Sequence, residues 1–208
     1  MPTAFPSLEF VAKKTATNQS TTKLRYSAAL ERFMKLIILH GPPASGKLTL
    51  AKLLKDELGY NILHNHLTVD IALEVYSEFG KDDFYEFVDQ LRTLAIEKAC
   101  QNKLEGLIVT LCFDEVLDIE VVEQWESIVA RYGGEILPVY LKVSAEVLAE
   151  RVTGESRIGT NKLQCPKELN KVLSENKFGA IPNKNTISID TNALCIKQSA
   201  RLIVEHTL

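Results

Sequence analysis

The sequence predicts an α/β fold, with a five-stranded parallel sheet, helices on both faces and a small lid. Three observations predict it. Short apolar segments alternate with longer segments in which apolar residues recur at helical spacing. The third apolar segment is a continuous run, which is typical of parallel strands buried on both faces. A polar stretch with two glycines lacks an apolar face and is the expected lid, near residues 153–165.

Five apolar segments are expected to form the strands. They lie at residues 36–39, 60–63, 107–113, 136–143 and 186–189. The segments between them have helical patterns, so right-handed crossovers join the strands and all of them run parallel. The carboxyl ends of the strands then share one edge of the sheet, where ligands bind in such folds.

Caps and breakers predict the helices of the first half of the chain. Gly59 is expected to end the first helix as its C-cap, and Gly80 to stop the second. A long helix is expected to start at Asp82 or Asp83 and to run to about Lys103. Its predicted inner face comprises Phe84, Phe87, Val88, Leu91, Leu94 and Ala95.

The later helices are predicted from their first residues. Asp114 or Glu115 is expected to open one helix, so the Asp114 carboxylate is interpreted as an N-cap rather than a magnesium ligand. Ser144 is expected to cap a short helix, and Pro166 fits the first turn of the next. Asn192 is expected to start the closing helix.

A glycine-rich loop connects the first strand to the first helix. The loop has the spacing Gly-x-x-x-x-Gly-Lys from Gly41 to Lys47, which in this context is typical of a P-loop. Backbone N–H groups of such a loop and the N-terminus of its helix bind phosphates, and Lys47 would contact the outermost ones. A purely structural turn is the alternative, which the flanking strand and helix disfavour. The predicted nucleotide-binding residues are Gly41, Pro42, Pro43, Ala44, Ser45, Gly46, Lys47, Leu48 and Thr49.

The loop departs from the full P-loop pattern after Lys47. A Ser or Thr normally follows the lysine and reaches Mg²⁺ through its hydroxyl. Here Leu48 follows, and Thr49 comes one position later. Adenylate-kinase-like enzymes resemble this arrangement, which implies that magnesium is held largely through water and carboxylates while Thr49 touches an inner phosphate. No protein residue is therefore predicted as a direct metal ligand.

Composition excludes several classes of function. The formal net charge of −3 gives no basic surface for nucleic acid, and no apolar run is long enough to span a membrane. The four cysteines lack metal-ligand or disulfide spacing and indicate reduced thiols in a cytoplasmic protein. A zinc site built from His64 and His66 lacks further ligands.

Residues 1–33 differ from the rest of the chain. They are rich in Ser, Thr, Ala and Lys, and Glu9 is the only acidic residue before Glu31. Two interpretations stay open, a cleaved transit peptide or a loose extension upstream of a functional start at Met34. Either way we expect residues 1–33 to be poorly structured and residues 34–208 to form the functional domain.

From Met34 onward the chain resembles the small P-loop kinases of the nucleoside-monophosphate-kinase and shikimate-kinase-like superfamily, which are P-loop NTPases. The resemblance rests on the P-loop, the order of strands and helices, and the arginines of Leu148-Ala149-Glu150-Arg151-Val152 and Ser156-Arg157. It implies that Arg151 and Arg157, with Lys162, close on the phosphates during transfer, and that the adenine rests near residues 190–192.

The substrate side departs from the shikimate kinases. Those enzymes have Asp-x-Asp after the second strand and a glycine triplet after the third. This chain has His64-Asn65-His66 and Thr110-Leu111-Cys112 there, so shikimate is not the expected acceptor. His66 and Asp70 are four residues apart on one helix face and are the predicted acceptor-binding residues. Bacterial small-molecule phosphotransferases place an acid after the second strand as general base, so the resemblance implies that role for Asp70. The alternatives are a helix cap or cleft wall for His66 and an exposed helix residue for Asp70.

These observations predict an ATP-dependent kinase that uses ATP and Mg²⁺ to phosphorylate a small-molecule acceptor. Lys47, Arg151, Arg157 and Asp70 are the predicted catalytic residues. The alternative is a nucleotide-binding ATPase or switch that acts on a protein partner, but the lid arginines favour transfer. The acceptor, the choice between ATP and GTP, and the choice between monomer and homodimer stay open.

Overall fold

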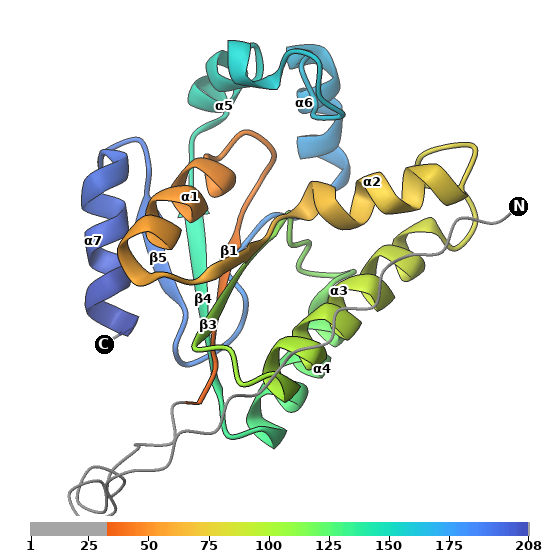
Figure 1. Cartoon of the computed structure of the whole chain (residues 1–208). Helices are drawn as coiled ribbons and strands as arrows, with labels where there is room; N and C mark the ends of the chain where they lie inside the picture. The colour runs from red at the N-terminus through yellow and green to blue at the C-terminus, as the bar shows by residue number, and fades with distance from the viewer. Residues whose placement is uncertain (1–32, 208) are drawn as a thin grey trace, which may run out of the picture. The chain divides into compact units, whose positions relative to one another are not determined.

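The computed structural model describes residues 33–207, so the predicted extension lies outside the described residues except for Phe33. Five parallel strands in the order β2-β3-β1-β4-β5 alternate with helices (Figure 1). The predicted fold class is confirmed. The strands are β1 (Lys35–His40), β2 (Asn61–Leu63), β3 (Gly106–Leu111), β4 (Glu135–Lys142) and β5 (Ile187–Asp190). The helices are α1 (Lys47–Leu58), α2 (Asn65–Val75), α3 (Phe84–Gln101), α4 (Ile119–Arg131), α5 (Ala145–Val152), α6 (Pro166–Glu175) and α7 (Ile196–Thr207), with a 3-10 helix, η1, at Glu155–Arg157.

The central strand β1 packs its alternate side chains on opposite faces of the sheet. Leu36 and Ile38 belong to the core with α3 and α4, and Ile37 and Leu39 belong to the core with α1 and α7. β1 pairs with β3 on one side and with β4 on the other, so its carboxyl end lies in the middle of the ligand-binding edge. The loop after β1 is therefore placed where ligands of parallel sheets bind.

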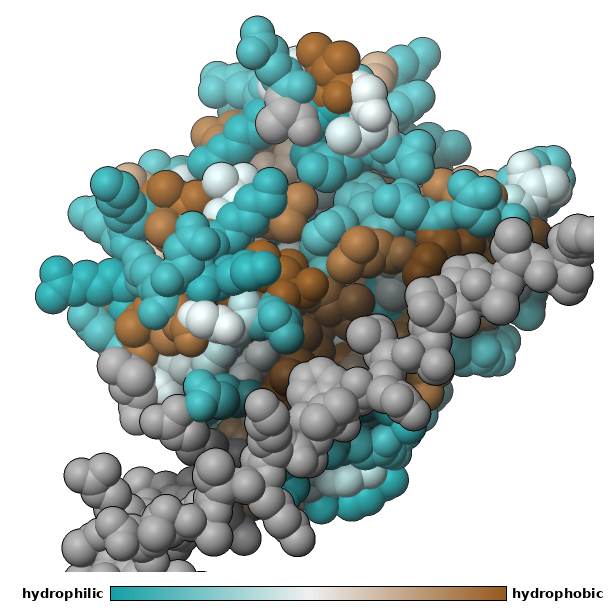
Figure 2. All heavy atoms as spheres, in the orientation of Figure 1, coloured by the Kyte–Doolittle hydropathy of each residue, from teal (hydrophilic) through white to brown (hydrophobic). Residues whose placement is uncertain are grey.

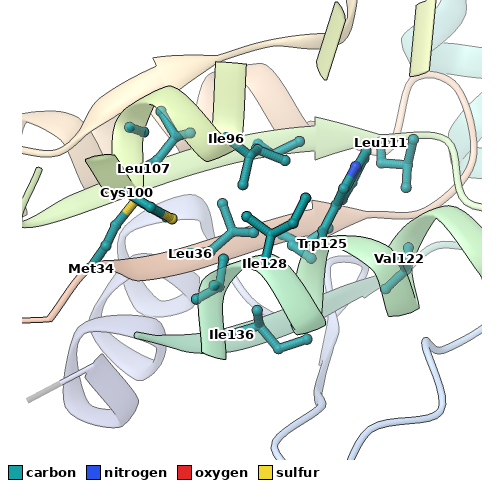
Figure 3. Close-up of a cluster of buried hydrophobic side chains, with 14 of the residues drawn as sticks. Met34, Leu36, Ile96, Cys100, Leu107, Leu111, Val122, Trp125, Ile128 and Ile136 are labelled. Atoms are coloured by element: carbon teal, nitrogen blue, oxygen red, sulfur yellow. The ribbon is translucent and has the colours of Figure 1, made fainter. Parts of the chain in front are cut away.

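The core beneath α3 and α4 is the larger of the two and contains Trp125 (Figure 3). The Trp125 side chain is fully buried, and its Nε1 donates a hydrogen bond of 2.8 Å to Thr93 Oγ1. Burying an indole of this size against Leu36 and Ile128 is worth several times the ~0.8 kcal/mol of one buried methylene. This face of the sheet is thus a rigid support for the site above it.

Helix α3 presents the predicted inner face in part. Phe84 and Val88 are buried and Phe87, Leu91 and Ala95 are half-buried, but Leu94 is 54 % exposed, and the buried stripe continues through Arg92, Ile96, Ala99 and Cys100. A charged residue, Arg92, thus occupies a position in the buried stripe. In the orientation of Figure 1, apolar surface gathers between α1, α2 and α3 (Figure 2).

Helix boundaries agree with the prediction where local capping decides them. Ser144 Oγ accepts the Val147 N–H at 3.4 Å, Pro166 is the first residue of α6, and Gly59 has a left-handed φ of 74° at the C-cap of α1. The predicted starts at residues 114 and 192 are wrong, because α4 begins at Ile119 and α7 at Ile196. The predicted end at Gly80 is also wrong, because α2 already ends at Val75. None of the described helices is long and apolar enough to cross a membrane.

The segment 153–165 connects α5 to α6 and contains η1. Leu148 and Val152 of α5 pack on Leu169 of α6 in a small separate core, which Ala44 of the glycine-rich loop also contacts. α5 and α6 lie beyond the carboxyl end of the sheet (Figure 1). The predicted lid segment therefore runs between two helices that cover the glycine-rich loop.

Candidate functional site: the glycine-rich loop and its cavity

The loop between β1 and α1 takes a conformation that needs glycine. Gly41 has φ 141° and Gly46 has φ 95°, and a Cβ at Gly41 would lie 2.8 Å from the Leu141 carbonyl oxygen. No side chain caps α1 at its N-terminus. The first N–H groups of α1 are thus open to an anionic ligand, and the positive end of the helix dipole favours one.

Lys47 lies over this loop. Its Nζ donates to the carbonyl oxygens of Gly41 and Pro42, each at 2.7 Å, and to Ser45 Oγ at 3.3 Å. Burial lowers the pKa of Lys47, and the charge of Arg157 lowers it further. No carboxylate within the described residues pairs with the ammonium. A bound phosphate would supply the missing negative charge.

A cavity of about 1420 Å³ opens from the loop along the carboxyl edge of the sheet. Pockets for one drug-sized ligand measure about 300–1,000 Å³, so this cavity has room for a nucleotide and a second molecule. The P-loop, α2, α3, the segment 112–118, the lid and α6 all contribute to its walls.

The structure brings Arg151, Arg157 and Lys162 to the same cavity as Lys47. Arg151 donates from Nη1 to Thr191 Oγ1 at 3.0 Å and from Nη2 to the Thr191 carbonyl at 2.9 Å. Arg157 donates from Nε to the Leu163 carbonyl at 2.6 Å, and no acceptor among residues 33–207 reaches its two Nη atoms. Burial lowers the pKa of Arg157 and of Lys162, as expected for cations held together without an anion.

The segment after β2 enters the cavity through His64, Asn65 and His66. The Asn65 N–H donates to Thr110 Oγ1 at 2.9 Å, which ties the start of α2 to the end of β3. Burial lowers the pKa of both histidines, and the charge of Lys162 lowers it further. Both imidazoles are therefore neutral at pH 7. His66, a predicted acceptor-binding residue, lies on the cavity wall.

Asp70 is placed differently from the other predicted residues. It is exposed, and its Oδ1 accepts a 3.0 Å hydrogen bond from Asn161 Nδ2 of the lid. It lines a smaller pocket of about 320 Å³ with His66 and Lys162, and it does not line the large cavity. The structure thus connects Asp70 to the lid and does not bring it to the cavity that holds Lys47.

Three polar residues of the cavity were missed by the sequence reasoning. Arg92 donates from Nη1 to Asp89 Oδ1 at 2.6 Å and from Nη2 to Asn65 Oδ1, and Asp118 interacts with both Arg92 and Asp89. All three line the cavity on the side of α3. The available signal was the spacing of Arg92, four residues after Val88 and four before Ile96, inside an apolar stripe.

Asp114 caps a turn and not a helix. Its Oδ1 accepts the N–H groups of Val116 at 2.8 Å and Leu117 at 3.1 Å, and its Oδ2 accepts that of Lys177 at 2.7 Å. Burial opposes ionisation, but these backbone hydrogen bonds prevail and lower the pKa of Asp114. Both oxygens are occupied, so this carboxylate is not a free ligand for magnesium.

The described residues fit the phosphates of a nucleotide. The open N–H groups, the close approach at Gly41 and the Lys47 ammonium, which has no carboxylate partner among residues 33–207, suit a polyphosphate. Residues 33–207 contain no group of three His, Cys, Asp or Glu side chains that could hold a metal ion. Mg²⁺ commonly keeps several waters and binds through substrate phosphates, so it could enter with the nucleotide.

Comparison with known proteins agrees with this geometry. A family model described as an AAA domain matches residues 37–165. The chain belongs to this family. A putative kinase from Chloroflexus aurantiacus is similar in structure, with a TM-score of 0.64, 20 % identity, and coverage of 84 % of this chain and 96 % of that one. The fold resemblance to small P-loop kinases of the nucleoside-monophosphate-kinase and shikimate-kinase-like type is confirmed.

Two further structures have a stated substrate class. A gluconokinase from Sinorhizobium meliloti aligns with a TM-score of 0.58 and 18 % identity, over 85 % of this chain and 93 % of that one. A shikimate kinase from Acinetobacter baumannii in complex with shikimate aligns with a TM-score of 0.52 and 15 % identity, over 84 % and 93 %. At these identities the likeness establishes the shared P-loop kinase fold, and the neighbours are small-molecule kinases.

Proposed function

We propose that the chain is an ATP-dependent kinase that transfers the γ-phosphoryl group to a hydroxyl of a small molecule. One observation carries the proposal. A single cavity joins the P-loop and Lys47 to Arg157 and to a second region, around His66 and Arg92, that the nucleotide would leave empty. A hydrolase or a switch that acts on a protein needs no such second region for a small molecule.

Phosphoryl transfer requires mainly positioning and charge stabilisation, because its transition state is loose and highly charged. We propose that the N–H groups of residues 41–49 bind the phosphates and that Lys47 exchanges its carbonyl partners for the outermost phosphate oxygens. Arg157 then contributes its two free Nη groups to the transferred group. Mg²⁺, bound with ATP, would neutralise part of the phosphate charge.

Arg151 and Asp70 receive narrower roles in this proposal. Arg151 is anchored at Thr191, near residues 190–192 where the adenine is expected, and adds positive charge from that side. Asp70 holds the lid through Asn161, and its predicted role as general base is tested separately below. His66 contacts the acceptor from the cavity wall.

Cell compartment and domain limits belong to the same proposal. All four cysteines are free thiols, which supports a reducing compartment such as the cytoplasm. We propose that residues 34–208 form the kinase domain and that residues 1–33 are an extension with no part in the chemistry.

The proposal is tested by incubating the protein with ATP labelled in the γ-phosphoryl group and a pool of small metabolites. A labelled small molecule other than inorganic phosphate is the expected product. Release of labelled phosphate alone, dependent on an added protein fraction, would instead support the switch. Nucleotide binding is measured on the same sample, because both functions require it. A sample that binds no nucleotide is inactive.

A further inference from the structure

We propose that the acceptor carries a protonated amine beside its hydroxyl groups, on a body with an apolar face, and that it is not a carboxylic acid or a phosphate ester. This inference rests on the proposed function and names its substrate class. It concerns the part of the cavity lined by α2, α3, the segment 112–118 and α6, which we term the acceptor half.

The cation of the acceptor half is already neutralised. Among the described residues that line this half, Arg92 is the one Arg or Lys, and its side chain is only 8 % exposed. Both of its Nη groups are occupied, one by the Asp89 carboxylate and the other by the Asn65 amide oxygen, and its Nε, which has no partner, is buried away from the cavity surface. The two histidines are neutral at pH 7 for the reasons given above. An anionic acceptor would find no unpaired positive charge here.

Carboxylates exceed cations in the same region. Asp118 lies close enough to Asp89 and Arg92 to interact with both, so two carboxylates share one guanidinium. One oxygen of Asp118, Oδ2, accepts the Asp114 N–H at 2.7 Å, and no donor within residues 33–207 reaches the other. On the α6 wall, Glu175 is paired with Lys171 at 3.9 Å, and Glu168 adds one further exposed carboxylate. Two carboxylates on one guanidinium leave an excess of negative charge in a partly buried place, which is costly, and a ligand cation would balance it.

The opening of the acceptor half is aromatic. Phe79 and Tyr85 line the cavity and are 60 % and 57 % exposed, with their rings edge to face at 5.8 Å. Val69 and Val88 lie deeper on the same side. Aromatic faces bind apolar groups and also attract ammonium groups through cation–π contacts. The same walls therefore suit both parts of an amine-bearing acceptor with an apolar face.

The four cavity cations outside the acceptor half do not alter this conclusion. Lys47 follows the glycine-rich loop and Arg151 is bonded to Thr191, while Arg157 and Lys162 lie in the lid, from which both act on His66. The nucleotide phosphates would bring several negative charges to these four cations. The cavity is therefore polarised, with cations at the nucleotide and carboxylates at the acceptor. The hydroxyl that reacts would lie between the two, with the amine directed toward Asp118.

The test divides a metabolite pool by charge. Cation-exchange and anion-exchange resins separate it into amine-bearing, neutral and acidic fractions, and each is incubated with the full chain, Mg²⁺ and γ-labelled ATP. The labelled small product should come from the amine-bearing fraction. A product from the acidic or neutral fraction would overturn the inference and leave the kinase function standing. No product from any fraction, with nucleotide still bound, would overturn both.

A variant tests the residue that carries the charge. D118N keeps an oxygen for the Asp114 N–H but removes the negative charge. It should raise KM for the amine-bearing acceptor about tenfold or more, because a hydrogen bond to a charged group is lost, and it should leave KM for ATP within about twofold. D56N, on the exposed face of α1, is the matched control and should change neither constant. An unchanged acceptor KM in folded D118N would refute the assignment.

Discussion

Replacing His40 tests the electrostatics directly behind the P-loop. His40 is the last residue of β1 and is fully buried, stacked on Tyr140 at 5.4 Å and in edge contact with Phe113 at 5.6 Å. The pKa of His40 is lowered from 6.5 to about 3, mainly by burial and also by the charge of Lys47, while the Gly179 backbone acts in the opposite direction. The imidazole must therefore stay neutral in the folded protein.

The size of the pH effect on the stability of the fold follows from proton linkage. The folded pKa lies below the unfolded one, so between pH 6.5 and pH 3 the unfolded chain binds a proton that the folded chain excludes. The free energy of unfolding therefore falls as the pH falls through this window. With pKa values of about 3 and 6.5, the loss between pH 7 and pH 4.5 is about 2.5 kcal/mol.

The assay is urea unfolding of the wild-type chain and of H40Q at both pH values. Glutamine has a similar size and does not titrate, and carboxylate titrations are common to both proteins and cancel in the comparison. Between pH 7 and pH 4.5, the free energy of unfolding of H40Q should fall by about 2.5 kcal/mol less than that of the wild type, whatever the absolute stability of H40Q. H206Q, on the exposed last turn of α7, controls for the loss of a histidine. Equal losses in the wild type and H40Q would refute the reasoning.

Three further predictions concern the lid, the predicted base and the extension. R157A should lower kcat about a hundredfold and change ATP affinity less than about threefold, because its free Nη groups act on the transferred group. Steady-state kinetics and nucleotide titration measure the two effects. A loss of ATP affinity as large as the loss of kcat would contradict the prediction. D70N should change kcat less than about threefold, because its carboxylate contacts the lid residue Asn161 and not the large cavity; a drop near a hundredfold would support the general-base role instead. A chain that begins at Met34 should keep its thermal midpoint and its nucleotide affinity, and a large drop in either would show that residues 1–33 stabilise the domain.

The fold class could be predicted because its signals are local. Apolar strands, helical spacing and the loop at Gly41 need only neighbouring residues to be recognised. The strand order could not be predicted in the same way, because β1 pairs with β3 and β4, whose first residues lie about 70 and 100 positions away. Such pairings depend on how the crossover helices pack.

The two predicted helix starts are wrong because the polar side chains there form hydrogen bonds with other partners. Asp114 has the chemistry of an N-cap, but one of its oxygens accepts the N–H of Lys177, 63 residues later. Asn192 lies in a turn, where its N–H donates to Asp190 Oδ1 at 2.8 Å and its Oδ1 accepts the Ser144 N–H at 3.2 Å. A one-dimensional pattern cannot separate these bonds from a helix cap.

The nucleotide side of the site was easier to predict than the acceptor side. Gly41, Gly46 and Lys47 follow a spacing that phosphate binding imposes on the backbone itself. Acceptor pockets have no such common spacing, because side chains from separate elements form them. Arg92 and Asp89 illustrate this, since they lie on a helix whose pattern predicts only packing.

In the proposed reaction, Lys47 supplies the charge that most directly stabilises phosphoryl transfer. K47M keeps much of the side-chain stem and removes the ammonium, and K55M, on the exposed face of α1, is the matched control. With γ-labelled ATP and the metabolite pool, K47M should form labelled small product at least about a hundredfold more slowly than wild type, with the fold intact by circular dichroism. K55M should match the wild type. Equal rates of product formation by K47M and the wild type would contradict the account.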